Sequence, residues 1–129
     1  MTAATLCLTP DEIRRVLEIE ESAFSHPWTV ADFEWLSQDE RSLNLGVWKG
    51  EALVGYAFGA VEGAVFHLAS LAVDSTCQRQ GWGSRLLSGS LERAARRGCR
   101  SCRLEVRRSN EVALNMYGKF GFAVDGVRG

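Results

Sequence analysis

Two glycines stand near the middle of the chain, where an apolar segment gives way to a helical pattern. The stretch Gln78-Arg79-Gln80-Gly81-Trp82-Gly83-Ser84 follows residues 67–73, typical of a buried strand, and precedes residues 86–97, which have helical periodicity. The first N–H groups of a helix have no internal partners, and the helix dipole makes this end positive. Glycine also lets a bulky anion approach the backbone closely. The stretch therefore predicts a cradle for a phosphate or pyrophosphate.

The residues of this turn exclude two common nucleotide-binding patterns but do not identify the ligand. The turn lacks the Gly-Lys-Ser/Thr ending of a nucleoside triphosphate loop, and it lacks the three-glycine dinucleotide pattern after a first strand. Taken alone, two glycines are equally typical of an ordinary connection between a strand and a helix. The choice between these readings depends on the rest of the chain.

Length and composition predict one soluble domain covering residues 1–129. Hydrophobic residues make up 46% and charged residues 24% of the sequence, enough for a packed core. No apolar run reaches the roughly 18 residues that a membrane span needs. Residues 1–8 lack the basic region of a signal peptide, so we expect a cytoplasmic protein.

Charge is unevenly distributed, although the net charge is −1. Residues 1–62 carry 11 acidic and 4 basic side chains, a net charge of −7, while residues 63–129 carry 5 and 11, a net charge of +6. A polyanionic cofactor at the basic half and a cationic substrate at the acidic half would explain this. A solvated helix face bearing the arginines of residues 93–100 is the alternative. The pI near 6.1 argues against nucleic-acid binding.

The cysteines do not predict a metal site. Cys99 and Cys102 have the CxxC spacing, but a zinc site would need a second ligand pair, and His26 and His67 lie far apart in the sequence. In redox motifs a CxxC pair stands at the start of a helix, whereas this pair stands at the entry of an expected strand. We expect reduced structural thiols and no bound metal.

The expected elements follow the order β-α-α-β-β-β-α-β-α-β. Strands are expected over residues 2–8, 43–48, 53–60, 65–73, 103–106 and 122–127, and helices over residues 10–22, 29–38, 86–97 and 111–119. Thr9 with Glu12 predicts a capping box, and Ile13, Val16 and Leu17 predict an apolar face opposite an acidic one at residues 20–21. Antiparallel strands followed by βαβ crossovers predict an α/β fold, a mixed sheet with helices on both faces.

Two motifs in this order resemble the GNAT superfamily of N-acetyltransferases. The first is Gln78-x-x-Gly81-x-Gly83, and the second is Asn110-x-x-x-Leu114-x-x-Tyr117-x-x-Phe120-Gly121-Phe122. Within the superfamily the chain is similar to the ribosomal-protein alanine N-acetyltransferases, through His26-Pro27-Trp28-Thr29, Leu71-Ala72-Val73-Asp74 and Leu104-Glu105-Val106-Arg107-x-Ser109-Asn110. The resemblance covers about residues 18–127.

This resemblance implies the transfer of an acetyl group from acetyl-CoA to the N-terminal α-amine of a protein, such as the alanine of a small-subunit ribosomal protein. It implies direct attack, with Glu105 as general base and Tyr117 as general acid. The residues implied to bind acetyl-CoA are Leu71, Ala72, Val73, Arg79, Gln80, Gly81, Trp82, Gly83, Ser84, Asn110 and Tyr117. An α-amine has a pKa of about 7.7–8.0, so deprotonating it needs far less help than deprotonating a lysine near 10.4.

Each of these roles has a structural alternative. Glu105 could be a solvent-facing strand residue paired with Arg103 or Arg107, Tyr117 could pack on the core, and Asn110 could cap a helix. Trp28, Phe33 and Trp35 could shape a peptide pocket or simply pack.

Two rival functions remain open. One is acetylation of a small amine by the same fold, and the other is an acetyl-CoA-binding domain with little activity. Family members continue with a tyrosine-bearing loop and a final strand, whereas this chain stops at Gly129. We therefore expect CoA binding to survive, peptide acetylation to be reduced, and the open sheet edge at residues 122–127 to invite self-association.

Overall fold

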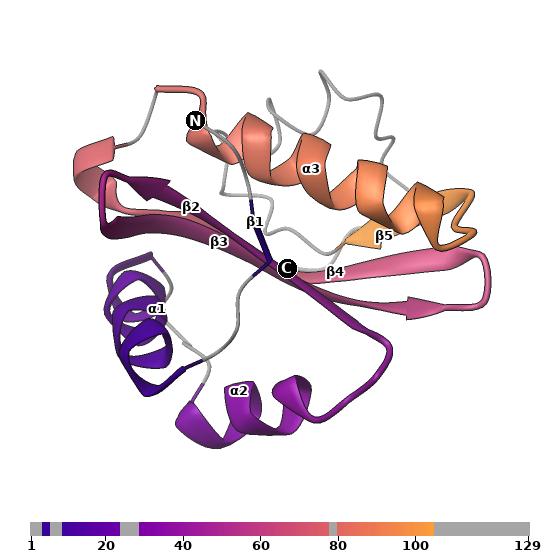
Figure 1. The fold of residues 1–129 in the computed structure, drawn as a ribbon, viewed down its shortest axis with the longest axis horizontal. Coiled ribbons are helices and arrows are strands. Elements are labelled where there is room, and N and C mark those ends of the chain that lie inside the picture. The colour runs from indigo at the N-terminus through magenta and orange to yellow at the C-terminus, as the bar shows by residue number, and fades with distance from the viewer. Residues whose placement is uncertain (1–3, 6–8, 24–28, 78–79, 105–129) are drawn as a thin grey trace, which may run out of the picture.

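The computed structural model describes residues 4–5, 9–23, 29–77 and 80–104. Within these residues, a central sheet of five strands in the order β1-β2-β3-β4-β5 separates two layers of helices. Helices α1 (Pro10–Ala23) and α2 (Val30–Ser37) lie on one face, and α3 (Trp82–Arg96) lies on the other (Figure 1). The expected mixed sheet with helices on both faces is thereby confirmed. The expected helix at 111–119 and strand at 122–127 lie outside the described residues.

Local sequence signals determine where the first two helices begin. Thr9 Oγ1 accepts the Glu12 N–H at 3.3 Å, and Glu12 Oε1 accepts the Thr9 N–H at 3.4 Å, which completes the expected capping box of α1. At α2, the Thr29 N–H donates to Asp32 Oδ2 at 2.9 Å. Each helix therefore has part of its unsatisfied N-terminal backbone paired by its own side chains.

Three long antiparallel strands form the middle of the sheet. These are β2 (Ser42–Lys49), β3 (Ala52–Glu62) and β4 (Val65–Val73), joined by turns at Gly50 and Gly63 with φ of 63° and 58°. The short strand β1 (Ala4–Thr5) pairs antiparallel with β2, and β5 (Ser101–Leu104) pairs parallel with β4. β5 begins two residues before the expected 103–106 segment.

A β-bulge interrupts β4 at Ala69. Phe58 of β3 pairs with Ser70, and the next residue, Gly59, pairs with Leu68, so Ala69 has no opposite residue. An extra residue reverses the alternation of side chains along a strand. Residues of β4 after Ala69 therefore point to the opposite face from the one that a regular strand would give them.

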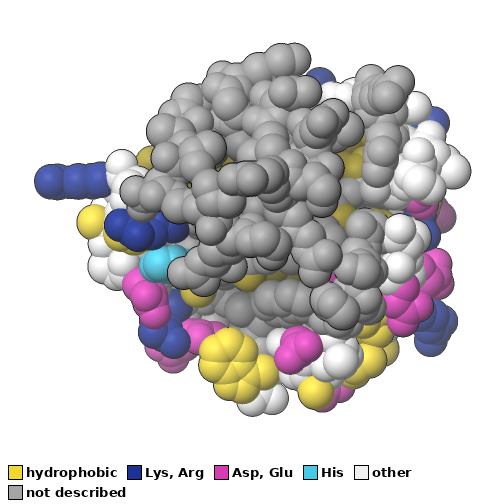
Figure 2. Space-filling view, turned by 180° about the vertical axis from the view of Figure 1, so that it is seen from behind, with side chains coloured by type: hydrophobic (Ala, Val, Ile, Leu, Met, Phe, Trp, Pro, Cys, Tyr) yellow, Lys and Arg dark blue, Asp and Glu magenta, His cyan; other side chains and the backbone are white. Residues whose placement is uncertain are grey.

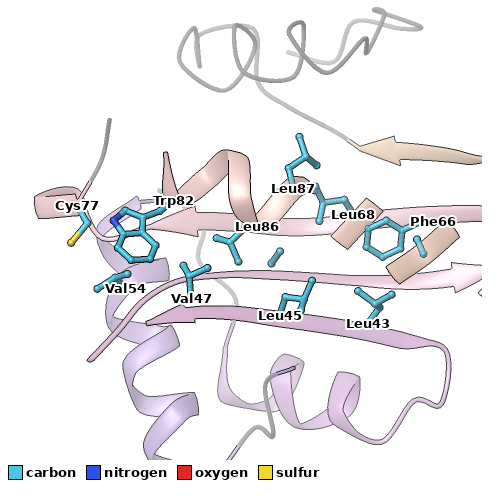
Figure 3. Packing of buried hydrophobic residues seen from close by; sticks show 12 residues of the cluster. Leu43, Leu45, Val47, Val54, Phe66, Leu68, Cys77, Trp82, Leu86 and Leu87 are labelled. Atoms are coloured by element: carbon cyan, nitrogen blue, oxygen red, sulfur yellow. The ribbon is translucent and has the colours of Figure 1, made fainter. Parts of the chain in front are cut away.

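Two apolar clusters, one on each face of the sheet, form the core. The α3-side cluster consists of Leu43, Leu45, Val47, Val54, Ala57, Phe66, Leu68, Cys77, Trp82, Leu86, Leu87 and Ala94. The α1-side cluster consists of Val16, Ile19, Phe33, Leu53, Tyr56, Phe58 and Ala72. Figure 3 shows how the side chains of α3 pack onto β2, β3 and β4 in the first of these clusters.

Candidate active site

The glycine turn forms an open helix N-terminus. A short 3-10 helix at Ser75–Cys77 follows β4, and Gly81 then adopts the left-handed conformation, with φ of 85°, directly before α3. The first bond of the helical ladder is the one from the Arg85 N–H to the Gly81 carbonyl at 3.1 Å. The N–H groups at positions 82–84 therefore precede the ladder and point out of the helix end. This is the geometry that anions bind.

The surroundings of this turn favour an anion. A β-carbon added to Gly81 would have no atom of the described residues within 4 Å, so no described neighbour crowds the turn at this position. No acidic residue stands in the first turn of α3, and no side chain of the described residues caps it. The dipole of α3 is thus opposed by no neighbouring carboxylate in its own first turn. The helix begins at Trp82, four residues before the expected start, so Gly83 and Ser84 belong to its first turn.

The side chain of Trp82 packs in the core, while its backbone lies in the glycine turn. Its indole is 3% exposed and lies with Val47, Val54 and Cys77 in the α3-side cluster (Figure 3). The indole N–H donates to Gln80 Oε1 at 3.2 Å. The ring thereby fixes the position of the turn while the peptide N–H remains at the helix end.

A polar junction fastens the start of this loop to the rest of the fold. The Asp74 N–H donates to the Val54 carbonyl at 2.7 Å, and Asp74 Oδ1 accepts the Thr76 N–H at 2.9 Å. Arg15 of α1 pairs with the Asp74 carboxylate and donates to the Leu53 carbonyl at 2.9 Å. Hydrogen bonds from the Thr76 backbone, and then from Arg15, lower the pKa of Asp74 below its ordinary value.

This lowered pKa predicts a pH dependence of stability. Because the folded-state pKa lies below the unfolded one, the contribution of Asp74 is complete above about pH 4 and is lost as the pH falls through the folded pKa. We expect Asp74→Asn to lower the free energy of unfolding at pH 7 and to weaken its fall below pH 4. Urea unfolding across this pH range measures both effects. Asp11→Asn is the control, since that side chain is 90% exposed and 3.7 Å from Arg14. Equal losses in both variants would contradict the role of Asp74.

The end of β4 presents backbone groups at the edge that faces β5. A β-carbon on Gly55 would lie 3.1 Å from the Ala72 carbonyl oxygen, so the backbone of Ala72 faces β3. Adjacent residues of a strand point to opposite edges, so the N–H groups of Leu71 and Val73 face away from β3. Within the described residues, the pairing with β5 ends at Leu68 and Leu104. Of the three expected cofactor residues on β4, Leu71 and Val73 therefore have backbone N–H groups at the edge away from β3, whereas the backbone of Ala72 faces β3.

Eight of the expected site residues, Ala72, Gln80 and Trp82 among them, lie in one continuous region of the fold. Leu71, Ala72 and Val73 end β4, and residues 80–84 form the turn and the start of α3. Arg79, Glu105, Asn110 and Tyr117 lie outside the described residues, so their roles stay predictions. Glu105 directly follows the last residue of β5 in the sequence.

The exposed surfaces of α1 and α2 are mainly acidic. Their exposed acidic side chains are Asp11, Glu18, Glu21, Asp32 and Glu34. Trp35 is 66% exposed, while Phe33 is fully buried in the α1-side cluster, so Phe33 has a packing role. Figure 2 shows acidic side chains beside exposed hydrophobic ones along the lower edge of one face. Trp35 remains a candidate for peptide contact.

The sequence analysis missed a buried carboxylate. Glu20, expected on the acidic face of α1, is 1% exposed and points into the core. The reason is visible in the helical period: residue 20 follows Val16 by four positions and Leu17 by three, so it lies on the apolar stripe. That spacing was the signal that could have identified it.

The described residues hold no group of three or more potential metal ligands. Cys77, Cys99 and Cys102 are free thiols, and burial raises the pKa of Cys102 to about 11. Such a thiol stays protonated near neutral pH and is a poor nucleophile.

None of the helices in the described part of the chain has the length and apolar character of a membrane span.

Comparison with known proteins agrees with this geometry. The model of the Acetyltransferase (GNAT) family matches residues 12–122. The [Ribosomal protein bS18]-alanine N-acetyltransferase of Escherichia coli (strain K12) is 32% identical over 115 residues, covering 89% of this chain and 77% of that protein. The crystal structure of the ribosomal-protein-S18-alanine N-acetyltransferase from Escherichia coli superposes with a TM-score of 0.87 at 30% identity, over 97% of this chain and 79% of that one.

A more distant structure shares the fold alone. It is AAC(6')-Iy in complex with the bisubstrate analog CoA-S-monomethyl-acetylneamine, with a TM-score of 0.79 and 18% identity over 98% of this chain and 92% of that one. The family match covers most of the chain, and relatives above 30% identity extend along nearly all of it. This chain belongs to the GNAT family of acetyltransferases.

Proposed function

We propose that this protein transfers the acetyl group of acetyl-CoA to the N-terminal α-amine of a protein, with an alanine-starting ribosomal protein as the substrate class. The observation that carries the cofactor assignment is the open N-terminus of α3 after left-handed Gly81, next to the outward-facing backbone of β4. The similarity to bS18-alanine N-acetyltransferases supports the acceptor. We treat residues 1–129 as one acetyltransferase domain.

The proposed cofactor position follows from these two features. The pyrophosphate of acetyl-CoA binds the N–H groups at positions 82–84, with help from the loop before them, Arg79 included. The pantetheine arm lies along β4 and pairs with the backbone of Leu71 and Val73, as an added strand would. An N–H group of the same strand polarises the thioester carbonyl and stabilises the oxyanion that develops there. Asn110 is assigned a hydrogen bond to the arm.

The chemistry is a direct transfer. The neutral amine nitrogen attacks the thioester carbon, the new C–N bond forms, and the C–S bond breaks as the tetrahedral intermediate collapses. Glu105 accepts the proton that leaves the amine, directly or through water, and Tyr117 donates a proton to the departing thiolate. No covalent enzyme intermediate is needed, so the cysteines take no part.

A panel of acceptors tests the proposed function. The purified protein is incubated with acetyl-CoA and three acceptors: an alanine-starting peptide, the same peptide with a blocked N-terminus and a free lysine, and a polyamine. We expect mass spectrometry to detect one acetyl group on the α-amine of the first peptide. Acetylation of the polyamine alone would replace the proposal by a small-amine acetyltransferase. Binding of CoA with no turnover of any acceptor would identify a binding domain instead.

A further inference from the structure

Three polar side chains from three elements meet in the core between α1 and the sheet. The Tyr56 hydroxyl of β3 and the Ser70 hydroxyl of β4 both donate to Oε1 of Glu20 on α1, the second at 2.9 Å. The exposed fractions are 1% for Glu20, 0% for Tyr56 and 8% for Ser70. A carboxylate so deeply buried is tolerated only with hydrogen-bond partners.

The hydrogen bond from Ser70 exists because of the bulge in β4. Before Ala69, Phe66 and Leu68 point into the α3-side cluster. Continued alternation would send Ser70 to that same apolar side, away from Glu20. The extra residue turns Ser70 toward α1, where it reaches the carboxylate. Only the bulged register satisfies this pair.

The same bulge decides which backbone groups face the β5 edge. A β-carbon on Gly59 would lie 2.6 Å from the His67 carbonyl oxygen, and one on Gly55 would lie 3.1 Å from that of Ala72. Before the bulge, the backbone groups that face β3 belong to an odd-numbered residue, His67. After the bulge they belong to an even-numbered residue, Ala72. In a regular strand Ala72 would face the β5 edge. In the bulged strand Leu71 and Val73 face it.

We infer that Glu20 is a positioning residue for acetyl-CoA, which acts through Ser70 to hold β4 in the bulged register that presents Leu71 and Val73 to the cofactor arm. This inference rests on the proposed function. Glu20 lies on the α1 side of the sheet with Tyr56, and we assign it no contact with the cofactor or the reacting atoms.

The hydrogen bond between Ser70 and Glu20 favours the bulged register of β4 over a regular one. In an unbulged strand the Ser70 hydroxyl would face the apolar α3-side cluster away from Glu20, and Glu20 would lose one of its buried donors. Tyr56 stays available as a donor, because burial and the neighbouring Glu20 carboxylate raise its pKa far above the ordinary value. The Tyr56 bond alone does not distinguish the registers, whereas the Ser70 bond does.

Removing the donor tests the inference on the intact chain. Calorimetric titration with CoA compares Ser70→Ala with the wild type and with Ser90→Ala. Ser90 is a matched control: it is fully buried on α3, and within the part of the chain that the structure describes its hydroxyl has no hydrogen-bond partner. We expect Ser70→Ala to weaken CoA binding by about 2- to 10-fold, the effect of one or two ordinary hydrogen bonds, and Ser90→Ala to leave it unchanged. The KM for the peptide acceptor should stay the same in both.

Substitutions of Glu20 separate positioning from chemistry. Glu20→Gln keeps an acceptor oxygen and should retain most of the CoA affinity, while Glu20→Met should match the loss of Ser70→Ala. The double variant should lose little more than either single one, because the two residues act as a pair. If Glu20→Met does not fold, Ser70→Ala carries the test alone.

The possible results are distinguishable. Unchanged CoA affinity in folded Ser70→Ala overturns the inference and leaves the proposed function intact. Loss of turnover in Glu20→Gln at unchanged CoA affinity also overturns it, because Glu20 would then take part in the reaction. Failure of the wild type to bind CoA would contradict the proposed function itself.

Discussion

Replacing Glu105 by glutamine should lower the rate of acetylation of an alanine-starting peptide by about 10²- to 10⁴-fold, the range expected when a general base is lost. The amide keeps the size of the side chain but cannot accept the proton of the attacking amine. CoA affinity should be unchanged, since Glu105 is assigned no cofactor contact. Comparing kcat/KM with the CoA dissociation constant measures both effects.

The pH profile adds a second readout for this variant. An α-amine deprotonates by itself above about pH 8, so the deficit of Glu105→Gln should narrow as the pH rises through this value. Glu51→Gln is the matched control, because Glu51 is exposed in the turn between β2 and β3. A Glu105→Gln enzyme with wild-type kcat/KM at pH 7 would refute the assignment, and Glu105 would then be a solvent-facing strand residue.

Replacing Trp82 by alanine should cost about 3–5 kcal/mol of the free energy of unfolding, the usual range for deleting a large buried aromatic side chain. The indole is 3% exposed and packs between β2, β3 and the 3-10 helix, and its N–H bond to Gln80 is also lost. For a domain with a typical stability of about 5–15 kcal/mol, this is a large fraction. Trp82→Phe, which keeps a ring, should lose less.

Trp35→Ala is the matched control for this prediction. The same substitution on the 66% exposed side chain of α2 should change stability by less than about 0.5 kcal/mol. Urea denaturation with an unchanged slope measures both variants. Similar losses for Trp82 and Trp35 would contradict the view that the side chain in the glycine turn serves the core and only its backbone serves the ligand.

Much of the fold was predictable because its signals are local. The capping box of α1 needs only two side chains three positions apart, Thr9 and Glu12, and it forms as expected. Gly50 and Gly63 adopt positive φ in the turns that join β2, β3 and β4. The apolar run at 65–73 has the same bounds as β4. The glycine turn predicted the connection between a strand and a helix, and α3 begins directly after Gly81.

The features that the sequence analysis missed depend on distant partners. Nothing near Ala69 marks it as a bulge, since the register of β4 is set by its pairing with β3 and by the reach of Ser70 to Glu20, 50 residues earlier in the chain. The same holds for Arg15, whose pairing with Asp74 spans 59 residues. The helical spacing places residue 20 on the apolar stripe of α1, but the donors that make a buried carboxylate acceptable there, Tyr56 and Ser70, come from distant strands.

The sequence by itself determined the order of the elements, the ends of the first helices, the position of the glycine turn and, through its motifs, the family. These depend on neighbours within one turn or one strand. Only the tertiary structure decided that Glu20 lies inside, that Trp82 belongs to the core, and that Leu71 and Val73 rather than Ala72 face the edge of β4. The physical reason is that strand register and burial are settled by contacts between elements far apart in the chain, where each buried polar group must find its partner.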